Sequence, residues 1–355
     1  MQTRSRRPRI ADVAREAGVS KTAVSFAFNN PARLNAGTAS HIREVARNLG
    51  YLPHPVARLL TQPRTLMLGV LTPQALSVVY RNPWFGHISE GIALAAEAAG
   101  YGLSFLSPLR GSLFESFGRA PVDGFIVIGL SRQHPEVEEI RRAGLPLVMV
   151  DSDPFPEHAS VEIDDAAGAR AAAEHLLALG HRDLVAIGVE PAIAEGQSGA
   201  GLTGRRLAGY RAALAAAGLE LPDDRLFVGP ATIPGGALCM RRAWDAGLRP
   251  TAVLAMSDAM AIGAQHVVRD EGWAVPADLS IVGFDDIDFA QYSDPPLTTV
   301  HQPIRSKGEE AVRLLLATIE YPDGGPVEHR RLETRLVVRG STAPPRSTKE
   351  VVGGV

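Results

Sequence analysis

The sequence predicts an N-terminal all-α helix-turn-helix head followed by an α/β core of two doubly wound parallel-sheet lobes. Three observations support this fold class. Two short helical patterns meet at a glycine near the N-terminus, strand and helix patterns alternate from about residue 65, and this rhythm restarts after residue 164. With 355 residues, 45% of them hydrophobic, the chain can bury more than one core.

The head begins with two helical patterns within residues 11–30, separated at Gly18. Ser20 is placed to cap the second helix by accepting a hydrogen bond from an exposed backbone N–H. The apolar positions at helical spacing are Val13, Ala14 and Ala17 in the first helix and Val24, Ala27 and Phe28 in the second. The second helix of such a motif reads the DNA major groove, and the side chains pointing away from its apolar stripe are Lys21, Thr22, Ser25, Phe26 and Asn29. The alternative is an ordinary surface helical hairpin.

A third helix is expected over residues 38–49, ended by Gly50. Prolines 53 and 55 then interrupt the pattern, and residues 56–61 are long enough for only one or two helical turns. So short a helix is marginal alone, so it needs DNA, a partner chain or both to hold its shape.

Charge is unevenly spread along the chain. Residues 1–64 hold 11 basic and 3 acidic side chains, a net +8, whereas the remainder holds 25 basic and 36 acidic, a net −11. A basic head on an acidic body confines attraction for phosphate to the head, which favours DNA binding over a plain helical hairpin.

The core alternates short branched-residue runs with helical stretches. Repeated units of this kind imply parallel sheets covered by helices on both faces, with ligands at the carboxyl ends of the strands. The expected strands are 66–71, 102–106, 125–128, 147–150, 184–187, 227–228, 252–255 and 280–284. The expected helices are 88–99, 135–143, 166–179, 205–217, 236–246 and 259–270.

Several classes of protein are disfavoured. The single Cys239 rules out an internal disulfide framework and suits a reducing cytoplasm, and no apolar segment follows the charged N-terminus as in a secretory signal. The longest apolar runs are too short to span a membrane. No phosphate-loop, dinucleotide or metal-ligand motif is present, so no catalytic residue, cofactor or metal is expected. The Pro-, Ser- and Gly-rich end of the chain, from about Ser341, is expected to be disordered.

The chain resembles LacI/GalR-type bacterial transcription repressors over nearly its whole length. The resemblance rests on the order of several segments, which are IADVAREAGVSKTAVSFAFN, HIREVARNLGYLPHPVARLL, GARAAAEHLLALGHRDL, RRLAGYRAAL, VPADLSIVGFDDID and DPPLTTVHQP. It implies a helix-turn-helix domain over 1–50, a hinge helix and linker over 51–64, and a periplasmic-binding-protein-like core over 65–343. The N-lobe is then 65–164 plus 294–321, the C-lobe is 165–293 plus 322–343, and residues 344–355 form a disordered tail.

For DNA, the resemblance implies that Lys21 and Thr22 read bases and that Ser25 and Asn29 lie near the phosphate backbone. Phe26 stands where the family commonly has an arginine, so guanine preference at that base is not carried over, because a phenyl ring makes no bidentate contact. Phe26 can instead meet a thymine methyl group or pack beside the first helix. The hinge residues Val56, Ala57 and Leu60 match the family pattern in which paired hinge helices enter the minor groove and a leucine wedges a base step. For Leu60 the alternative is ordinary linker packing.

For an effector, the resemblance implies a site between the lobes. The candidate residues are Trp84, Phe85, Asp151, Arg206, Ser257 and Asp285. A carboxylate at a strand end accepts hydrogen bonds from ligand hydroxyls, and a guanidinium can bridge two ligand oxygens. For the charged residues the alternative is a salt bridge that holds the lobes together, and for the aromatic ones it is core packing. Ser257 stands where many family members have an asparagine, and Ala231 lies near a position where an aromatic residue that stacks on the ligand is common. The effector's identity therefore does not follow from the resemblance, and a sugar or glycoside is expected.

The function implied is a cytoplasmic, homodimeric repressor. It binds a near-palindromic operator in double-stranded DNA, and a small effector controls this binding. The absence of a C-terminal leucine heptad disfavours a tetramer built by a coiled coil. The alternatives are a solute-binding protein of sugar-transport type and a nucleotide-handling α/β enzyme.

Overall fold

The computed structural model describes residues 8–51, 64–72, 74–108, 111–131, 134–153, 155–190, 201–321 and 327–346. The chain divides into two compact units, residues 1–65 and 66–355, and each is described by itself. No helix in these described ranges is long and apolar enough to cross a lipid bilayer.

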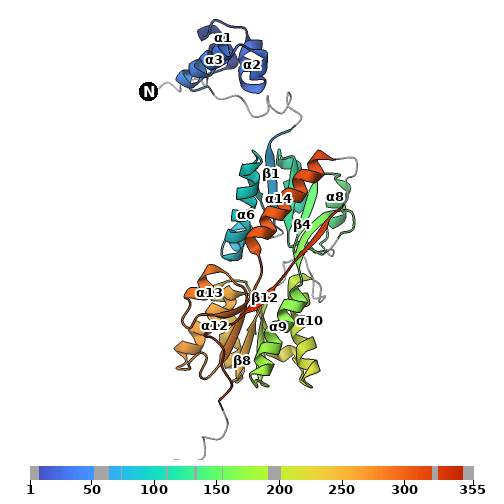
Figure 1. Ribbon diagram of the computed structural model, residues 1–355, viewed down its shortest axis with the longest axis vertical. Coiled ribbons are helices and arrows are strands. Elements are labelled where there is room, and N and C mark those ends of the chain that lie inside the picture. Colours follow the sequence, from blue (N-terminus) through green and yellow to red (C-terminus); the bar gives the residue numbers. More distant parts are fainter. Residues whose placement is uncertain are drawn as a thin grey trace, which may run out of the picture. The chain divides into compact units, whose positions relative to one another are not determined.

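The first unit is a small bundle of helices (Figure 1). Its elements are α1 (Ile10–Glu16), α2 (Lys21–Asn29), the 3-10 turn η1 (Pro31–Arg33) and α3 (Ala36–Leu49). Gly18 lies in the turn between α1 and α2 with φ +65°, a conformation that side chains disfavour. The predicted cap of α2 is confirmed, since Ser20 Oγ accepts from the backbone N–H of Ala23 at 3.1 Å.

The buried side of these helices matches the predicted stripes. The fully buried members of this core are Val13, Ala14, Val24, Ala27, Ile42 and Ala46. Phe28 is partly buried and meets Tyr51 edge-on, with the ring centroids 6.0 Å apart. Helix α3 begins two residues earlier than predicted, because Asn35 caps it by accepting from the N–H of Gly37 at 2.8 Å.

The second unit contains two six-stranded sheets. The N-lobe sheet has the order β11-β5-β4-β3-β1-β2 with every neighbouring pair parallel. Its strands are β1 (Met67–Leu71), β2 (Gly102–Leu106), β3 (Gly124–Ile128), β4 (Leu147–Val150), β5 (Ala159–Ile163) and β11 (His329–Leu332). Two apolar clusters flank it, one with α6 (Trp84–Ala98) and α14 (Ile304–Glu320), the other with α7 (Leu113–Arg119) and α8 (Val137–Arg142). The short helix α5 (Leu76–Val79) follows β1.

The C-lobe sheet has the order β12-β10-β9-β8-β6-β7, parallel except for the β10–β12 pair. Its strands are β6 (Leu184–Val189), β7 (Leu226–Gly229), β8 (Ala252–Ala255), β9 (Ser280–Asp285), β10 (Thr298–His301) and β12 (Arg335–Val337). One face packs on α9 (Asp165–Ala178) and α10 (Gly201–Ala216), the other on α11 (Ile233–Asp245) and α12 (Asp258–Asp270). The short elements are η2 (Asp223–Arg225) and α13 (Asp288–Tyr292).

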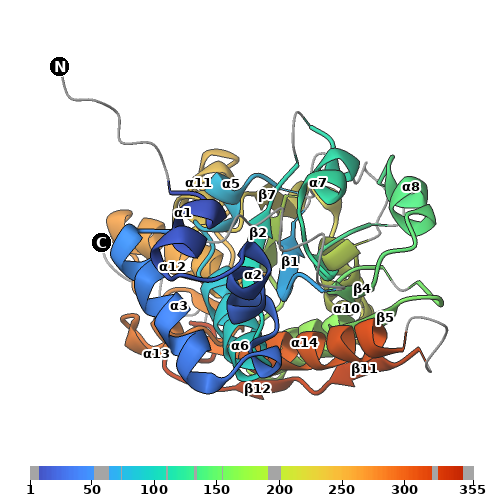
Figure 2. The same ribbon diagram turned by 90° about the horizontal axis from the view of Figure 1, so that it is seen from above.

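Helices α6 and α14 lie side by side (Figures 1 and 2) and approach closely because glycines face the partner helix. A Cβ on Gly91 would lie 2.0 Å from the carbonyl oxygen of Arg305, and one on Gly308 would lie 2.5 Å from that of Ile88. Contacts this short exclude any side chain at the two positions without a shift of the backbone. The two glycines therefore allow the backbones of α6 and α14 to pack closely against each other at this point.

The chain passes between the two sheets three times. It leaves the N-lobe after β5 near Asp164, returns after β10 near Gln302, and leaves again between β11 and β12 near Glu333. The expected boundaries at Ser293 and Tyr321 are corrected here, because β10 pairs with β9 and β11 pairs with β5. The sequence patterns named none of β5, β10, β11 and β12 as strands.

The C-terminal segment is ordered further than its composition predicts. Ser341 is fully buried and its hydroxyl donates to the carbonyl of Ile281, while Ala343 N donates to Ser280 Oγ at 3.0 Å. His181 is also buried, and its Nε2 lies 2.9 Å from the carbonyl oxygen of Ala343. The expected disorder from Ser341 is therefore wrong as far as Arg346, which pairs with Asp278.

Candidate functional site

Helix α2 carries the DNA-facing candidates in the head. Lys21 and Thr22 are exposed in its first turn, whereas Ser25 and Asn29 are half-buried and paired, with Asn29 Nδ2 donating to Ser25 Oγ at 3.3 Å. Phe26 is half-buried, and the guanidinium carbon of Arg33 lies 5.3 Å from its ring centroid. The hinge candidates Val56, Ala57 and Leu60 lie outside the described residues.

In the second unit, two candidate carboxylates occupy equivalent places in the two lobes. Asp151 follows β4 of the N-lobe, and Asp285 is the last residue of β9 in the C-lobe. Both have positive φ angles, +48° and +120°, in a region where side chains are disfavoured. Unfavourable backbone at strand ends is typical of functional sites, where the surrounding structure holds it in place. Both side chains are buried.

Arg206 of α10 lies among acidic groups of the C-lobe. Its Nε donates to Asp165 Oδ1 at 2.9 Å, its Nη1 lies 3.6 Å from Asp285 Oδ1, and Nη1 also donates to the carbonyl of Met256. The guanidinium stacks on Phe284, 3.5 Å from the ring centroid. The guanidinium is only 2% exposed, and both of its acidic partners belong to the C-lobe, so its ion pairs do not join the two lobes as the salt-bridge alternative supposed.

A second group of contacts joins Asp151 to Asp285 through residues that sequence reasoning missed. Lys307 of α14 is fully buried and donates to both carboxylate oxygens of Asp151 at 2.8 and 2.7 Å, and to Gln302 Oε1 at 2.6 Å. Gln302 in turn donates through Nε2 to Asp285 Oδ1 at 2.6 Å. These residues, with Arg206 and Asp165, form one continuous chain of polar contacts, hereafter the junction network.

Arg205 is a direct link between the lobes. Its Nε donates to Asp165 Oδ2 at 3.0 Å within the C-lobe side of the network. Its other nitrogens lie 3.4 Å from the carbonyl oxygen of Asp151 and 3.7 Å from Asp153 Oδ1, both of the N-lobe. Opening the lobes would therefore have to break or lengthen the contacts of this side chain.

Burial and neighbouring charge set the protonation of the network. Burial raises the pKa of Asp285 to about 6, against the lowering effect of Arg206 and Gln302. Burial alone would raise the pKa of Asp165, but Arg206 and Arg205 hold it below its ordinary value. Burial, followed by the nearby charge of Asp285, raises the pKa of Asp258, which also accepts from the backbone N–H of Ile287 at 2.9 Å.

The other candidates have different surroundings. Trp84 is buried in the N-lobe core and meets Phe85 edge-on, with the ring centroids 4.9 Å apart. The Trp84 centroid lies 5.5 Å from Lys307 Nζ, so Trp84 borders the network. Ser257 is buried as the cap of α12, accepting from Met260 N at 3.2 Å. Within the described ranges, no cluster of three His, Cys, Asp or Glu side chains could hold a metal ion.

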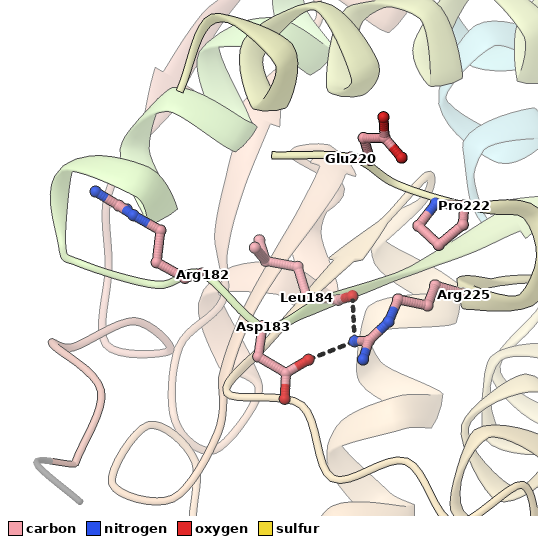
Figure 3. A pocket seen from close by; sticks show the side chains of 6 residues that line it. All are labelled: Arg182, Asp183, Leu184, Glu220, Pro222 and Arg225. Carbon is pink, nitrogen blue, oxygen red and sulfur yellow. Dashed lines mark hydrogen bonds and ion pairs between the residues drawn. The ribbon is translucent and has the colours of Figure 1, made fainter. Parts of the chain in front are cut away.

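A surface pocket of about 440 Å³ lies elsewhere, at the start of β6 (Figure 3). The ion pair between Arg225 and Asp183 crosses it, and Arg225 also donates to the carbonyl of Leu184 at 3.1 Å. Ligands of parallel sheets bind at the carboxyl ends of strands, whereas this pocket lies at an amino end. The junction network, not this pocket, is the candidate effector site.

Comparison with known proteins agrees with this architecture. Residues 9–54 match the family model "Bacterial regulatory proteins, lacI family", and residues 173–342 match "Periplasmic binding protein-like domain". The chain is 32% identical to the transcriptional regulator CelR of Thermobifida fusca, over 95% of this chain and 99% of that protein. It is 32% identical to the repressor CytR of Escherichia coli K12, over 93% of this chain and 95% of that protein.

Solved structures give the same result. A CelR–cellobiose complex aligns with a TM-score of 0.70 at 29% identity, covering 94% of this chain and all of that one. The lac repressor dimer bound to operator and the anti-inducer ONPF aligns with a TM-score of 0.77 at 26% identity, covering 95% of this chain and all of that one. The resemblance seen in the sequence is thereby confirmed, and the chain belongs to the lacI family of bacterial transcriptional regulators.

Proposed function

We propose that this chain is a repressor-type, sequence-specific transcriptional regulator whose affinity for its operator is set by a neutral, polyhydroxylated effector at the junction network. The observation that supports the effector site most strongly is the continuous chain of contacts from Asp151 through Lys307 and Gln302 to Asp285. It links the carboxyl ends of β4 and β9, whose neighbours in the two sheets are parallel, and ligands of such sheets bind at these ends.

The charges of the network favour a neutral ligand. Three carboxylates, of Asp151, Asp165 and Asp285, face three cations, of Lys307, Arg206 and Arg205. A charged ligand would add an unmatched charge to this balanced set, and burying such a charge costs several kcal/mol. A ligand rich in hydroxyls can instead replace individual hydrogen bonds without changing the balance. A sugar or glycoside has this chemistry, and the relative CelR has been solved with cellobiose.

In the head, we assign base reading to Lys21 and Thr22 and backbone contacts to Ser25 and Asn29, as the family resemblance implies. The same resemblance assigns the minor-groove wedge to Leu60, with Val56 and Ala57 in the paired hinge helices. Two heads related by a two-fold axis then read a near-palindromic operator.

The network also supplies a physical route for control. Arg205 contacts both lobes, so a ligand that changes its contacts to Asp151 and Asp153 shifts the balance between more and less closed forms. Coupling energies of about 1–3 kcal/mol are typical of such linkage between sites. The relatives are transcription regulators, so we propose a cytoplasmic regulator without catalytic activity rather than a solute-binding protein or an enzyme.

The test combines an operator titration with an effector screen. Palindromic fragments from around its own gene are titrated at about 50 and 200 mM salt, where phosphate contacts predict a steep loss of affinity. Neutral sugars and their phosphorylated and carboxylated derivatives are then screened for a rise in thermal midpoint, since a ligand of the folded state stabilises it by mass action. Salt-insensitive binding would contradict the DNA-binding role, and a response to charged derivatives alone would contradict the effector class.

A pair of matched variants locates the effector site. Asp285→Asn keeps the shape of the side chain but removes the charge opposite Arg206, so it should weaken effector response at least about ten-fold while operator binding persists. Asp286→Asn changes the neighbouring carboxylate, which pairs with Arg339 and His301 outside the network, and should leave the response close to normal. Equal effects of both variants would contradict the assignment.

A further inference from the structure

The aromatic side chain on the recognition helix is covered by a cation from the following turn. Phe26 belongs to α2, and Arg33 ends η1, which begins two residues after α2. The guanidinium carbon lies 5.3 Å from the centroid of the Phe26 ring, within the range of a cation–π contact. Arg33 is exposed and Phe26 is half-buried, so the ring forms a platform for the cation.

Arg33 differs from other arginines of the head in what its guanidinium contacts. Arg43 donates to the carbonyl of Ala27 at 3.0 Å, and Arg15 pairs with Asp12 at 3.1 Å. Within the described part of the head, the ring of Phe26 is the contact seen for the guanidinium of Arg33, with neither a hydrogen bond nor an ion pair. Stacking uses the face of a guanidinium and leaves the N–H donors at its edge available.

We infer that Phe26 and Arg33 act as one unit in operator recognition, in which the phenyl ring holds the guanidinium of Arg33 to donate two hydrogen bonds to a guanine in the major groove. The planar fork of arginine matches the O6 and N7 acceptors of guanine, and the phenyl ring lacks any donor of its own. The guanidinium that α2 lacks at position 26 is thus supplied from η1. This inference rests on the proposed operator binding and names the residue that determines part of its specificity.

The experiment separates base reading from simple charge. The full-length wild-type protein first selects its preferred sites from a library of randomised palindromic duplexes. Affinities of wild type, Arg33→Lys, Phe26→Leu and the double variant are then measured at fixed salt on the selected site and on each single-base variant of it. Arg47→Lys, at an exposed arginine of α3, is the matched control, and circular dichroism checks that each head is folded.

If the inference holds, Arg33→Lys keeps its charge and its slope of affinity against salt but loses about ten-fold or more on the selected site. That loss occurs at one guanine per half-site, where the preference of the variant for guanine is weakened, because an ammonium lacks the planar fork of a guanidinium. Phe26→Leu gives a similar loss at the same base, and the double variant adds little, because each single change already disables the unit. Arg47→Lys leaves the base preference unchanged.

Two outcomes overturn the inference while leaving the regulator intact. If Arg33→Lys lowered the affinity for every DNA sequence by the same factor, Arg33 would be a phosphate contact. If the losses of affinity from Arg33→Lys and Phe26→Leu added in the double variant, the two residues would act separately. Failure of the wild-type protein to select any sequence would instead count against the proposed function itself.

Discussion

The buried pair of Lys307 and Asp151 allows a quantitative test of the junction network. Lys307→Met replaces the ammonium with an apolar chain of similar length, in a side chain that is 0% exposed. The side chain of Asp151, itself 7% exposed, then loses its counter-charge, and the Oε1 atom of Gln302 loses a hydrogen-bond donor. Removing one partner of a buried pair costs about 3–5 kcal/mol, and stranding a neutral acceptor adds about 1 kcal/mol. This is a large part of a typical stability of about 5–15 kcal/mol.

The second variant is Asp151→Asn, and with Lys307→Met and the double variant it forms a double-mutant cycle. Asparagine tolerates the positive φ of position 151 about as well as aspartate, so the backbone does not confound the comparison. The double variant Lys307→Met/Asp151→Asn has no buried charge at either position, and it should recover at least about 2 kcal/mol relative to the sum of the single losses.

The assay is urea denaturation followed by circular dichroism, with midpoints compared at constant slope. Arg305→Met is the control on the same helix, since the pair of Arg305 with Glu90 is exposed at the surface, and no change in midpoint is expected. Single losses that add within about 0.5 kcal/mol would refute the coupling of Lys307 and Asp151.

Three further predictions concern stability. Ser20→Ala removes the oxygen that accepts from Ala23 and should lower the stability of the head by about 1 kcal/mol, whereas Ser20→Asp retains a cap; thermal melts of the head check this. Because burial raises the pKa of Asp285 from 3.8 to about 6, the folded protein binds more protons than the unfolded chain between these values. The free energy of unfolding should therefore fall as pH rises through about 6, and Asp285→Asn should flatten that fall in urea midpoints across pH. Gly308→Ala brings a Cβ to 2.5 Å from the carbonyl of Ile88 and should lower the thermal midpoint, whereas an unchanged midpoint would contradict the close approach of α6 and α14.

Much of the fold could be predicted from the sequence because its signals are local. The apolar stripes of the head and the branched runs of β1, β3, β4, β8 and β9 each lie within a few residues, so periodicity alone finds them. Of the four missed strands, β10 carries such a signal, since its sequence Thr-Thr-Val-His contains three β-branched residues, whereas β11 lacks it. Strand β11 is an edge strand with the sequence His-Arg-Arg-Leu and three exposed residues, and it is a strand only because β5 lies beside it.

Some residues of the candidate site could likewise be predicted from the sequence, and others could not. Asp151 and Asp285 could be named because each follows a strand pattern and matches a family position. Lys307 could not be paired with Asp151, because the two residues are 156 positions apart and meet only through folding. One signal was available. Lys307 follows the buried Ile304 by three residues and precedes the buried Ala311 by four, so it occupies an apolar stripe where a lysine requires a partner.

The threefold passage of the chain between the lobes has a mechanical consequence. Each sheet is completed by a strand that arrives from the other half, so no continuous stretch of sequence encodes either half alone. A protease that cut any one of the three passages would leave two covalent tethers in place, and the halves would stay together as a nicked but folded body. Fragment libraries made by truncation from either end should therefore yield the complete core or nothing soluble, while the head, encoded in one piece, can be detached.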